Sequence, residues 1–339
     1  MRLGRSRGAG FGGPQAVAAL WMLMGLLTGS VVASPPAEPV VGSGVDASGS
    51  EGPPYVYVLG IAQDGGVPQA GTRQPPAWRP ADLRRLVTCL AVVDPSEDRR
   101  YLFEATPDLR EQLAVLDRVA PTPRIPGIDG IFLTHAHIGH YTGLMFLGHE
   151  SMGAKGVPVY AMPRMAAFLR EHGPWSQLVR YRNIELQELA SGEPVRLGGG
   201  LSVTPFPVPH RQEFSEVVGY RIDGPNRSVL FIPDIDSWDD LDAAGTRIED
   251  LLAAVDVAYL DATFFADGEI PGRDMSTFPH PKIVESMARF APLPAEERAK
   301  VRFIHLNHTN PALGHDTEAR RRIVAGGFRV AEEGERLDL

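Results

Sequence analysis

Cysteine is nearly absent from this sequence. The 339 residues include a single one, Cys89, which excludes an intramolecular disulfide framework and any zinc site built on several thiolates. An excess of basic residues is missing as well, because 33 Lys and Arg stand against 42 Asp and Glu, for a net charge of −9. Nucleic acid is therefore disfavoured as a partner, since neutralising phosphates requires a basic surface. The 10 histidines are what this composition leaves to be explained.

The N-terminal segment has the pattern of a secretory signal peptide. Three arginines, Arg2, Arg5 and Arg7, precede an apolar run over 16–27, and small residues follow up to Ala33. An uncleaved membrane anchor is the alternative, because the apolar stretch approaches the lower limit for spanning a bilayer. Cleavage after residue 33 would change the net charge to −12, because it removes three arginines and no acidic residue. We expect an exported protein, periplasmic or secreted, with no stable membrane insertion after cleavage.

The rest of the chain is predicted to form one domain after a short linker. Residues 34–54 are rich in Ser, Pro, Gly and Ala without apolar periodicity, which is typical of a flexible linker. A mixed α/β domain should then cover 55–339, since no second linker divides it. Within it, Thr106 is the expected N-cap of a helix over 108–119. Further strands and helices are expected at the ranges listed here: strands at 55–59, 87–93, 101–103, 130–133, 157–161, 202–205, 228–232, 257–260 and 301–304, and helices at 141–147, 164–171, 281–291 and 318–325.

The strongest local signal is a histidine-rich loop. His135, His137 and His140 follow an apolar strand pattern and precede an apolar helical turn. Neutral imidazoles are common ligands of transition metals, so a metal site is the leading interpretation. A polar surface loop is the plainer alternative. Side chains at alternate positions, such as His135 and His137, can converge on one ion, while His140 can face a second.

Other candidate ligands also follow strand patterns. His210, Asp234 and His305 each come at the end of an apolar run. A single His or Asp in such a position is more often a cap or a turn residue. Together with the histidine-rich loop, however, they predict a metal site at the edge of a sheet, where the strands hold the backbone and the loops present the ligands.

These residues resemble the ligand pattern of the metallo-β-lactamase superfamily. Its motif is His-x-His-x-Asp-His, followed at large separations by a His, a bridging Asp and a final His. The resemblance implies a four-layer αββα sandwich with the metal site along one edge of its two sheets. It also implies one metal position at His135, His137 and His210, with Asp234 bridging to a second position at His140 and His305.

A narrower resemblance is to the PqqB-like branch, named for pyrroloquinoline quinone biosynthesis. It is carried by the stretches 59–69, 105–110, 208–211, 231–236 and 305–311. Gly139 departs from the superfamily, because it stands where the motif has Asp and so removes a carboxylate ligand. A single metal, or a weakly loaded second position, is the resulting expectation. The sequence also lacks the cysteines that biosynthetic members often carry after the Gly-Gly-x-Pro-Gln stretch, so no structural zinc is expected there.

Several polar residues are candidates for catalytic roles. Asp236 could replace the missing motif Asp as a base, although a turn cap is an equal alternative. Asp261 and His280 resemble the proton-donating pair of phosphodiesterase branches, or else form a structural pair. His308 could stabilise an oxyanion or act as an extra ligand. We expect Asp64 to anchor the turn at 65–69 by hydrogen bonds.

The resulting hypothesis is an exported metal-dependent hydrolase that uses metal-bound hydroxide. The target would be an ester, amide or phosphoester bond of a small molecule. Zinc is the expected metal, one or two ions, with iron or manganese as alternatives. A non-haem iron oxidoreductase of the same fold, or a non-catalytic binder of a small acidic or quinonoid ligand, are the competing hypotheses. Substrate and oligomeric state are not readable from the sequence.

Overall fold

The computed structural model describes residues 52–72 and 84–339. The predicted signal segment and nearly all of the predicted linker lie outside these residues. The first strand of the domain, β1, begins at Tyr55 and pairs antiparallel with the last strand, β14, where Tyr55 lies opposite Asp338. The two ends of the domain therefore meet in one sheet. Within the described residues no helix is long and apolar enough to cross a membrane.

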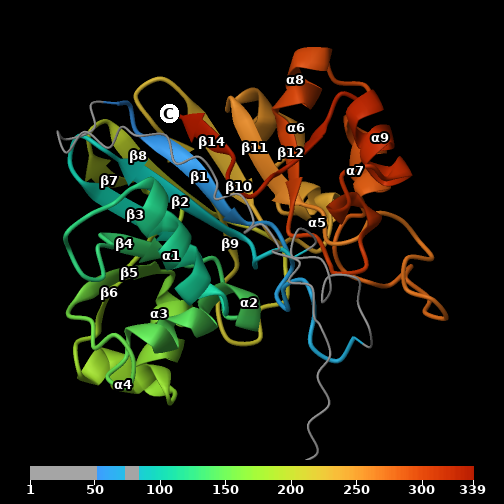
Figure 1. Cartoon of the computed structure of the whole chain (residues 1–339). Coiled ribbons are helices and arrows are strands. Elements are labelled where there is room, and N and C mark those ends of the chain that lie inside the picture. The colour runs from blue at the N-terminus through green and yellow to red at the C-terminus, as the bar shows by residue number, and fades with distance from the viewer. Residues whose placement is uncertain (1–51, 73–83) are drawn as a thin grey trace, which may run out of the picture. The chain divides into compact units, whose positions relative to one another are not determined.

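Two seven-stranded sheets form the centre of the domain (Figure 1). Each has an antiparallel part and a parallel part. The first sheet has the order β14 (Arg336–Asp338), β1 (Tyr55–Gly60), β2 (Cys89–Asp94), β3 (Arg99–Phe103), β4 (Gly130–Phe132), β5 (Val157–Ala161) and β6 (Ile184–Glu188). The second has the order β13 (Arg329–Val330), β12 (Val301–Ile304), β11 (Val257–Asp261), β10 (Ser228–Ile232), β9 (Val218–Asp223), β8 (Leu201–Pro207) and β7 (Val195–Gly198).

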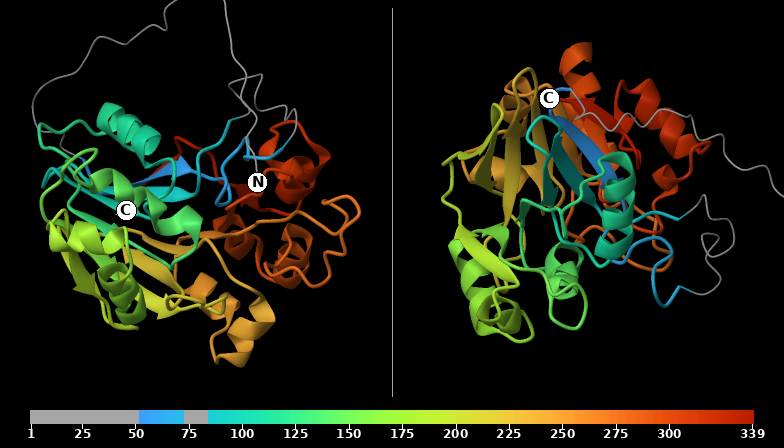
Figure 2. Two further views of the ribbon diagram at one scale, coloured as in Figure 1. Left: turned by 90° about the horizontal axis from the view of Figure 1, so that it is seen from below. Right: turned by 60° about the vertical axis from the view of Figure 1, so that its left-hand side comes forward.

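Helices cover the outer faces of both sheets (Figures 1 and 2). The first sheet carries α1 (Leu109–Val119), α2 (Ile138–Tyr141), η3 (Thr142–Leu147), α3 (Pro163–Glu171) and α4 (Trp175–Arg180). The second carries α5 (Trp238–Ala243), α6 (Ile248–Ala253), α7 (Ile283–Phe290), α8 (Ala295–Lys300), η4 (Pro311–Leu313) and α9 (Glu318–Ala325). This arrangement is the predicted αββα sandwich, and the prediction of the fold is confirmed.

Alternation along the strands explains why two separate cores form. In β2, Leu90 and Val92 point between the sheets, whereas Cys89, Ala91 and Val93 pack beneath the helices of the first sheet. Successive side chains of a strand point to opposite faces, so a strand that is covered on both faces is apolar throughout. All six residues of β2 are buried.

Aromatic side chains fill the space between the two sheets. Phe132 stacks on Phe103 and Tyr160, with ring centroids 5.0 and 4.3 Å away, and meets Tyr220 edge-on at 5.7 Å. Phe103 also meets Phe231 edge-on. These contacts join β3 and β4 to β9 and β10. They hold the two sheets together close to the strand ends that carry the candidate ligands.

Two local predictions are wrong. The helix that begins at Leu109 has Asp108 as its N-cap, because the Thr106 hydroxyl closes a turn with the Asp108 N–H at 3.1 Å before the helix begins. The predicted helix over 141–147 is instead the short α2 followed by the 3₁₀ helix η3. A bond from the Gly143 N–H to the Ala105 carbonyl, 2.8 Å long, ties the second segment to the strand end of β3.

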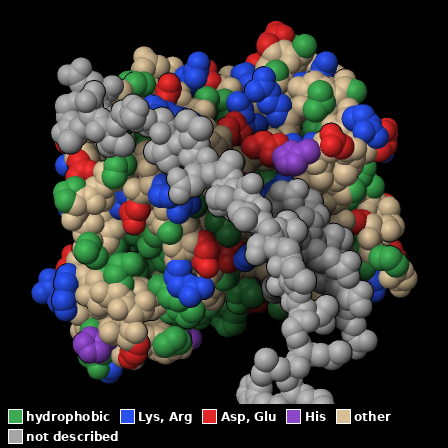
Figure 3. Space-filling model, in the orientation of Figure 1, with side chains coloured by type: hydrophobic (Ala, Val, Ile, Leu, Met, Phe, Trp, Pro, Cys, Tyr) green, Lys and Arg blue, Asp and Glu red, His purple; other side chains and the backbone are tan. Residues whose placement is uncertain are grey.

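Charged side chains of both signs are interspersed on the face seen in Figure 3. Ion pairs at the surface of the described residues include Arg124 with Asp129 at 2.7 Å and Arg170 with Glu188 at 2.9 Å. Exposed pairs of this kind contribute little to stability. Because these pairs mix the two signs of charge, they work against the basic patch that binding to nucleic acid requires.

Candidate metal centre

The candidate ligands all follow the carboxyl ends of strands. The histidine-rich loop follows β4, His210 follows β8, Asp234 follows β10 and His305 follows β12. Neighbouring parallel strands end at the same edge of their sheet, so the loops after them meet there. Six side chains that are spread over 171 positions of the sequence thus come together in one place, namely His135, His137, His140, His210, Asp234 and His305.

The first group of ligand atoms comprises His135, His137, His210 and Asp234. His210 Nε2 lies 3.2 Å from His137 Nδ1 and 3.3 Å from Asp234 Oδ2, and His135 Nε2 lies 3.5 Å from Asp234 Oδ2. Ligand atoms about 2.0–2.1 Å from a tetrahedral zinc ion lie about 3.3 Å from one another. The spacing of this group fits such an ion.

The second group comprises His140, His305 and Asp64. Asp64 Oδ1 lies 3.1 Å from His140 Nε2 and 3.4 Å from His305 Nε2. Asp234 Oδ2 lies 3.6 Å from His140 Nε2, so Asp234 lies between the two groups. The carboxylate of Asp64, which was expected to anchor its turn, faces two candidate ligands.

Unpartnered buried atoms provide a test of whether a metal fits. Among the described residues, seven buried side-chain nitrogen or oxygen atoms have no hydrogen-bond partner, and five belong to these two groups. Such atoms are costly unless something satisfies them. The five are Asp64 Oδ1, His135 Nε2, His140 Nε2, Asp234 Oδ1 and His305 Nε2. Their donor chemistry, imidazole and carboxylate, fits a divalent transition metal.

The opposite nitrogen of each candidate histidine is held by a polar neighbour. Such outer contacts fix the ring and its tautomer, so that the other nitrogen presents a lone pair to the metal. The contacts are His135 Nδ1 to Thr134 Oγ1 at 2.9 Å, His137 Nε2 to Glu213 at 3.1 Å, His140 Nδ1 to Glu104 at 3.1 Å, His210 Nδ1 to Asp236 at 2.7 Å and His305 Nδ1 to Thr263 Oγ1 at 3.0 Å.

Glu104 is a site residue that sequence reasoning missed. It follows β3, is fully buried, and adopts a positive φ of 85°. Its Oε1 accepts from the Thr134 hydroxyl at 2.5 Å and lies 3.1 Å from His140 Nδ1. One carboxylate therefore positions both Thr134 and His140, at the two ends of the histidine-rich loop. The sequence shows an acidic residue directly after a strand, but it does not show that this residue is buried.

Asp236 occupies a different place from the one expected of a base. Its Oδ1 bonds His210 Nδ1, on the side of the ring away from the first ligand group. A carboxylate in this position orients the imidazole and raises its basicity. Asp236 therefore holds a candidate ligand in place, because its carboxylate contacts the His210 ring.

Asp261 and His280 form the pair that the sequence suggested. His280 Nδ1 lies 2.8 Å from Asp261 Oδ2 and 3.0 Å from Asp234 Oδ1. Burial lowers the pKa of the His280 imidazole, but the negative charges of Asp261 and Asp234 outweigh the burial and hold that pKa well above its ordinary value. A protonated ring beside the metal groups can donate a proton.

His308 belongs to none of the groups of candidate metal ligands among the described residues. Its Nδ1 bonds Asn307 Oδ1 at 2.8 Å, and burial lowers the pKa of its imidazole. Asn307 in turn bonds the hydroxyl of Thr309 at 2.8 Å. These contacts give His308 a place in the loop after β12 without direct contact to the candidate ligands.

Charge and burial prepare the ligands for a cation. Burial lowers the pKa of His135 well below its ordinary value, so this ring is neutral, which is the form that binds metal. Burial raises the pKa of Asp234, but the charge of His280 and the contacts with His135 and His210 outweigh it and hold that pKa well below the usual range. The site therefore combines an ionised carboxylate with a neutral imidazole.

Two of the site histidines have strained backbones. His280 has φ 88° and His305 has φ 66°, in the left-handed region that residues with a side chain rarely adopt. Strain of this kind costs on the order of 1–3 kcal/mol and persists where the surroundings enforce it. Its occurrence at two histidines and at Glu104 marks the same loops that converge on the candidate metal centre.

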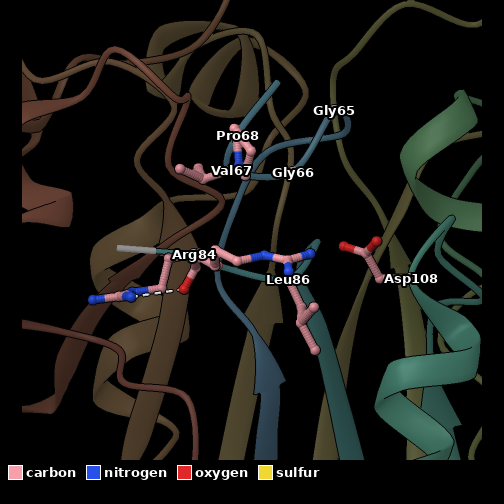
Figure 4. A pocket seen from close by; sticks show the side chains of 8 residues that line it. Gly65, Gly66, Val67, Pro68, Arg84, Leu86 and Asp108 are labelled. Carbon is pink, nitrogen blue, oxygen red and sulfur yellow. Dashed lines mark hydrogen bonds between the residues drawn. The ribbon is translucent and has the colours of Figure 1, made fainter. Parts of the chain in front are cut away.

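A small pocket lies beside the turn that follows Asp64 in the chain (Figure 4). Its volume is about 90 Å³. Gly65 to Pro68 line one side, and the side chain of Arg84 points toward Asp108 across it. The turn at 65–69 thus borders a small pocket that also contains charged side chains.

Comparison with known families agrees with this geometry. The family model described as a beta-lactamase superfamily domain matches residues 99–305. The coenzyme PQQ synthesis protein B of Methylobacterium nodulans is 30% identical over 314 residues, which cover 83% of this chain and 99% of that protein. The fold and the site thus define a protein of the metallo-β-lactamase fold.

Comparison with solved structures gives a more specific similarity than the family model. Zn²⁺-bound PqqB from Methylobacterium extorquens superimposes with a TM-score of 0.70 at 26% identity, and the match covers 84% of this chain and 100% of that one. A diphosphatase from the PhnP family, at 24% identity, 84% and 96% coverage and a TM-score of 0.60, shares the fold. The chain belongs to the metallo-β-lactamase superfamily and within it is PqqB-like.

Glu104→Gln should weaken metal binding by about 10–100-fold, because loss of an outer contact to a ligating histidine has an effect of this size. Glutamine keeps the shape of the side chain but not the charge that holds His140. Competition with a chromogenic chelator measures the affinity. Glu111→Gln, an exposed acid on α1, is the matched control. An affinity unchanged by Glu104→Gln would contradict the role given to Glu104.

Proposed function

We propose that this protein is a metal-dependent hydrolase that cleaves an ester, amide or phosphoester bond of a small molecule. The observation that carries the proposal is the pair of His and carboxylate groups joined at Asp234, in which five buried polar atoms make no hydrogen bond. Two ligand groups beside one another are typical of hydrolytic metal sites, where the ions stabilise both the attacking and the leaving oxygen.

Zinc is the proposed metal, with one or two ions. The ligands are imidazole nitrogens and carboxylate oxygens, which suit zinc, and the similar PqqB of Methylobacterium extorquens is described as Zn²⁺-bound. When bound, such an ion lowers the pKa of a coordinated water to about 7 and polarises the oxygen of the scissile group.

His280 is proposed as the group that donates a proton to the leaving group. Its Nδ1 faces Asp261 and Asp234, so its Nε2 remains available to a substrate. Asp261 is itself held, since its Oδ1 accepts from the Thr263 N–H at 2.9 Å and its Oδ2 from the Ile235 N–H at 3.0 Å. A fixed carboxylate keeps the imidazole oriented and protonated.

An iron-dependent oxidoreductase is the second candidate. The group of Asp64, His140 and His305 is a set of two histidines and one carboxylate, the ligand set of many non-haem Fe(II) oxygenases. The two candidates differ in the metal they retain and in whether they need an electron acceptor.

We also propose that the protein is exported and acts in the periplasm or outside the cell. The support is the basic N-terminus at Arg2, Arg5 and Arg7, the apolar run over 16–27 and the small residues before Ser34. For this reason the proposal does not include synthesis of the quinone cofactor for which the curated relatives are named. A small molecule is the proposed partner, and nucleic acid is not.

His135→Ala should abolish both metal retention in the first group and hydrolysis, because it removes a buried ligand. Metal content after aerobic purification is measured by mass spectrometry, and turnover is measured with a panel of ester and phosphoester substrates. Lys155→Ala, in an exposed loop, serves as the control. Iron at near-stoichiometric occupancy without any hydrolysis would favour the oxidoreductase. Ligand binding that survives His135→Ala would favour a non-catalytic binder.

His280→Gln should reduce kcat by about 10²–10⁴-fold for substrates with poor leaving groups, the usual contribution of a general acid. A nitrophenolate leaving group needs no proton, so its substrate should be affected little. Since the pKa of His280 is raised, the protonated form is present at neutral pH and is lost as the pH rises through that value. The alkaline fall in the wild-type rate should therefore vanish in the variant. Equal losses for both substrates would argue against proton donation.

Expression of the full chain in a bacterial host should yield a mature protein that begins near Ser34. Intact-mass measurement of the protein from the periplasmic fraction identifies the new N-terminus. Replacement of the apolar segment by charged residues should retain the uncleaved chain in the cytoplasm. An uncleaved chain that remains in the membrane fraction would support the anchor instead.

A further inference from the structure

We propose that Asp64 supplies the carboxylate ligand of the second metal position, in place of the Asp that the family motif has at position 139. Gly139 occupies the motif position and has no carboxylate to offer. The loop after β1 provides one instead. This inference rests on the proposed metal-dependent function, and it reverses the expectation of an incomplete second position.

The carboxylate of Asp64 and Gly139 compete for the same space. A Cβ atom built on Gly139 would lie 2.1 Å from Asp64 Oδ1 and 2.6 Å from Asp64 Cα, which no real structure tolerates. The backbone gives no other reason for glycine here, because Gly139 lies in the helix α2 and does not have a positive φ. Glycine inside a helix is even destabilising relative to alanine. Gly139 is therefore required by the presence of Asp64.

Hydrogen bonds hold the loop that carries Asp64 beside His305. The Gln63 N–H donates to the Leu306 carbonyl and the Leu306 N–H donates to the Ile61 carbonyl, both at 2.8 Å. The residues directly before Asp64 are thus bonded to the residue directly after His305. A further bond from the Gly66 N–H to the Gln63 carbonyl, also 2.8 Å, closes the turn around Asp64.

The distances around Asp64 show why a cation belongs at this point. An imidazole that binds a metal is neutral. His305 Nδ1 lies 3.0 Å from the Thr263 hydroxyl and His140 Nδ1 lies 3.1 Å from Glu104, so in the neutral form each ring would keep its proton on Nδ1 and turn a lone pair on Nε2 toward Asp64. Asp64 Oδ1 lies 3.1 and 3.4 Å from these two Nε2 atoms, which in the metal-binding form would both be acceptors. Acceptors at these distances repel unless a positive charge lies between them.

A purely orienting role for Asp64 fits the contacts less well. His140 is already oriented by Glu104 at its other nitrogen. Neither Asp64 Oδ1 nor His140 Nε2 has a hydrogen-bond partner, although the two atoms lie close together. Both atoms instead point toward a shared position that His305 Nε2 and the bridging Asp234 also border. This is the arrangement of ligands around a common ion.

The test is metal stoichiometry and affinity in the full mature chain. Wild type, Asp64→Asn, Asp64→Ala, Gly139→Asp and the double exchange D64G/G139D are stripped with a chelator and titrated with Zn²⁺. We expect two ions in the wild type and one in both Asp64 variants. The second affinity should fall by more than about 100-fold, because even outer contacts are worth about 10–100-fold. Asp316→Asn, an exposed acid, controls for the lost charge.

The exchange variant makes the proposal falsifiable independently of folding defects in any single variant. Gly139→Asp alone should lower Tm through the clash with Asp64, whereas D64G/G139D should recover the second ion at least in part. Two ions held by both Asp64 variants with wild-type affinity, or only one ion in the wild type, would overturn the proposal. A wild type that binds two ions and hydrolyses nothing would instead count against the proposed function and leave this inference standing.

Discussion

The structure depends on one electrostatic constraint, the burial of a carboxylate and of imidazole nitrogens that face one another. Asp64 Oδ1 lies 3.1 Å from His140 Nε2 and 3.4 Å from His305 Nε2, and none of these three buried atoms makes a hydrogen bond. A buried polar atom without a hydrogen bond destabilises the folded state by more free energy than most single contacts contribute to it. A divalent cation resolves the conflict, so folding and metal binding are expected to be coupled in this protein.

The two sheets meet this constraint by bringing strand ends together. Loops after strands of both sheets carry the ligands, and the aromatic layer around Phe103 and Phe132 holds the sheets against each other beneath them. Outer contacts such as that of Glu104 then fix each imidazole in one tautomer. The positive φ values of His280 and His305 show that this convergence is maintained against local backbone preference.

Much of the architecture was predictable, because period-2 and period-3.6 apolar patterns depend on local geometry. The strand at 228–232 and the helix at 318–325 lie where the pattern placed them. The cap at Thr106 and the segment at 141–147 were not predictable, since hydrogen bonds to distant backbone decide both. The resemblance of the ligand motifs to the metallo-β-lactamase superfamily implied the αββα fold, and both family and fold are confirmed, while the identity of the metal and the substrate stay proposals.

The sequence by itself determined the mixed α/β class and which histidines were candidate ligands, because strand patterns and motifs are local properties of the chain, and the resemblance of those motifs implied the family and its fold. It also showed that the motif Asp was replaced by Gly139. Only the tertiary structure decided what that replacement means. Asp64 lies 75 positions earlier in the chain, and its proximity to Gly139 exists only because the loop after β1 is bonded to the residue after His305. Contacts of this kind depend on sheet pairing, which no local pattern encodes.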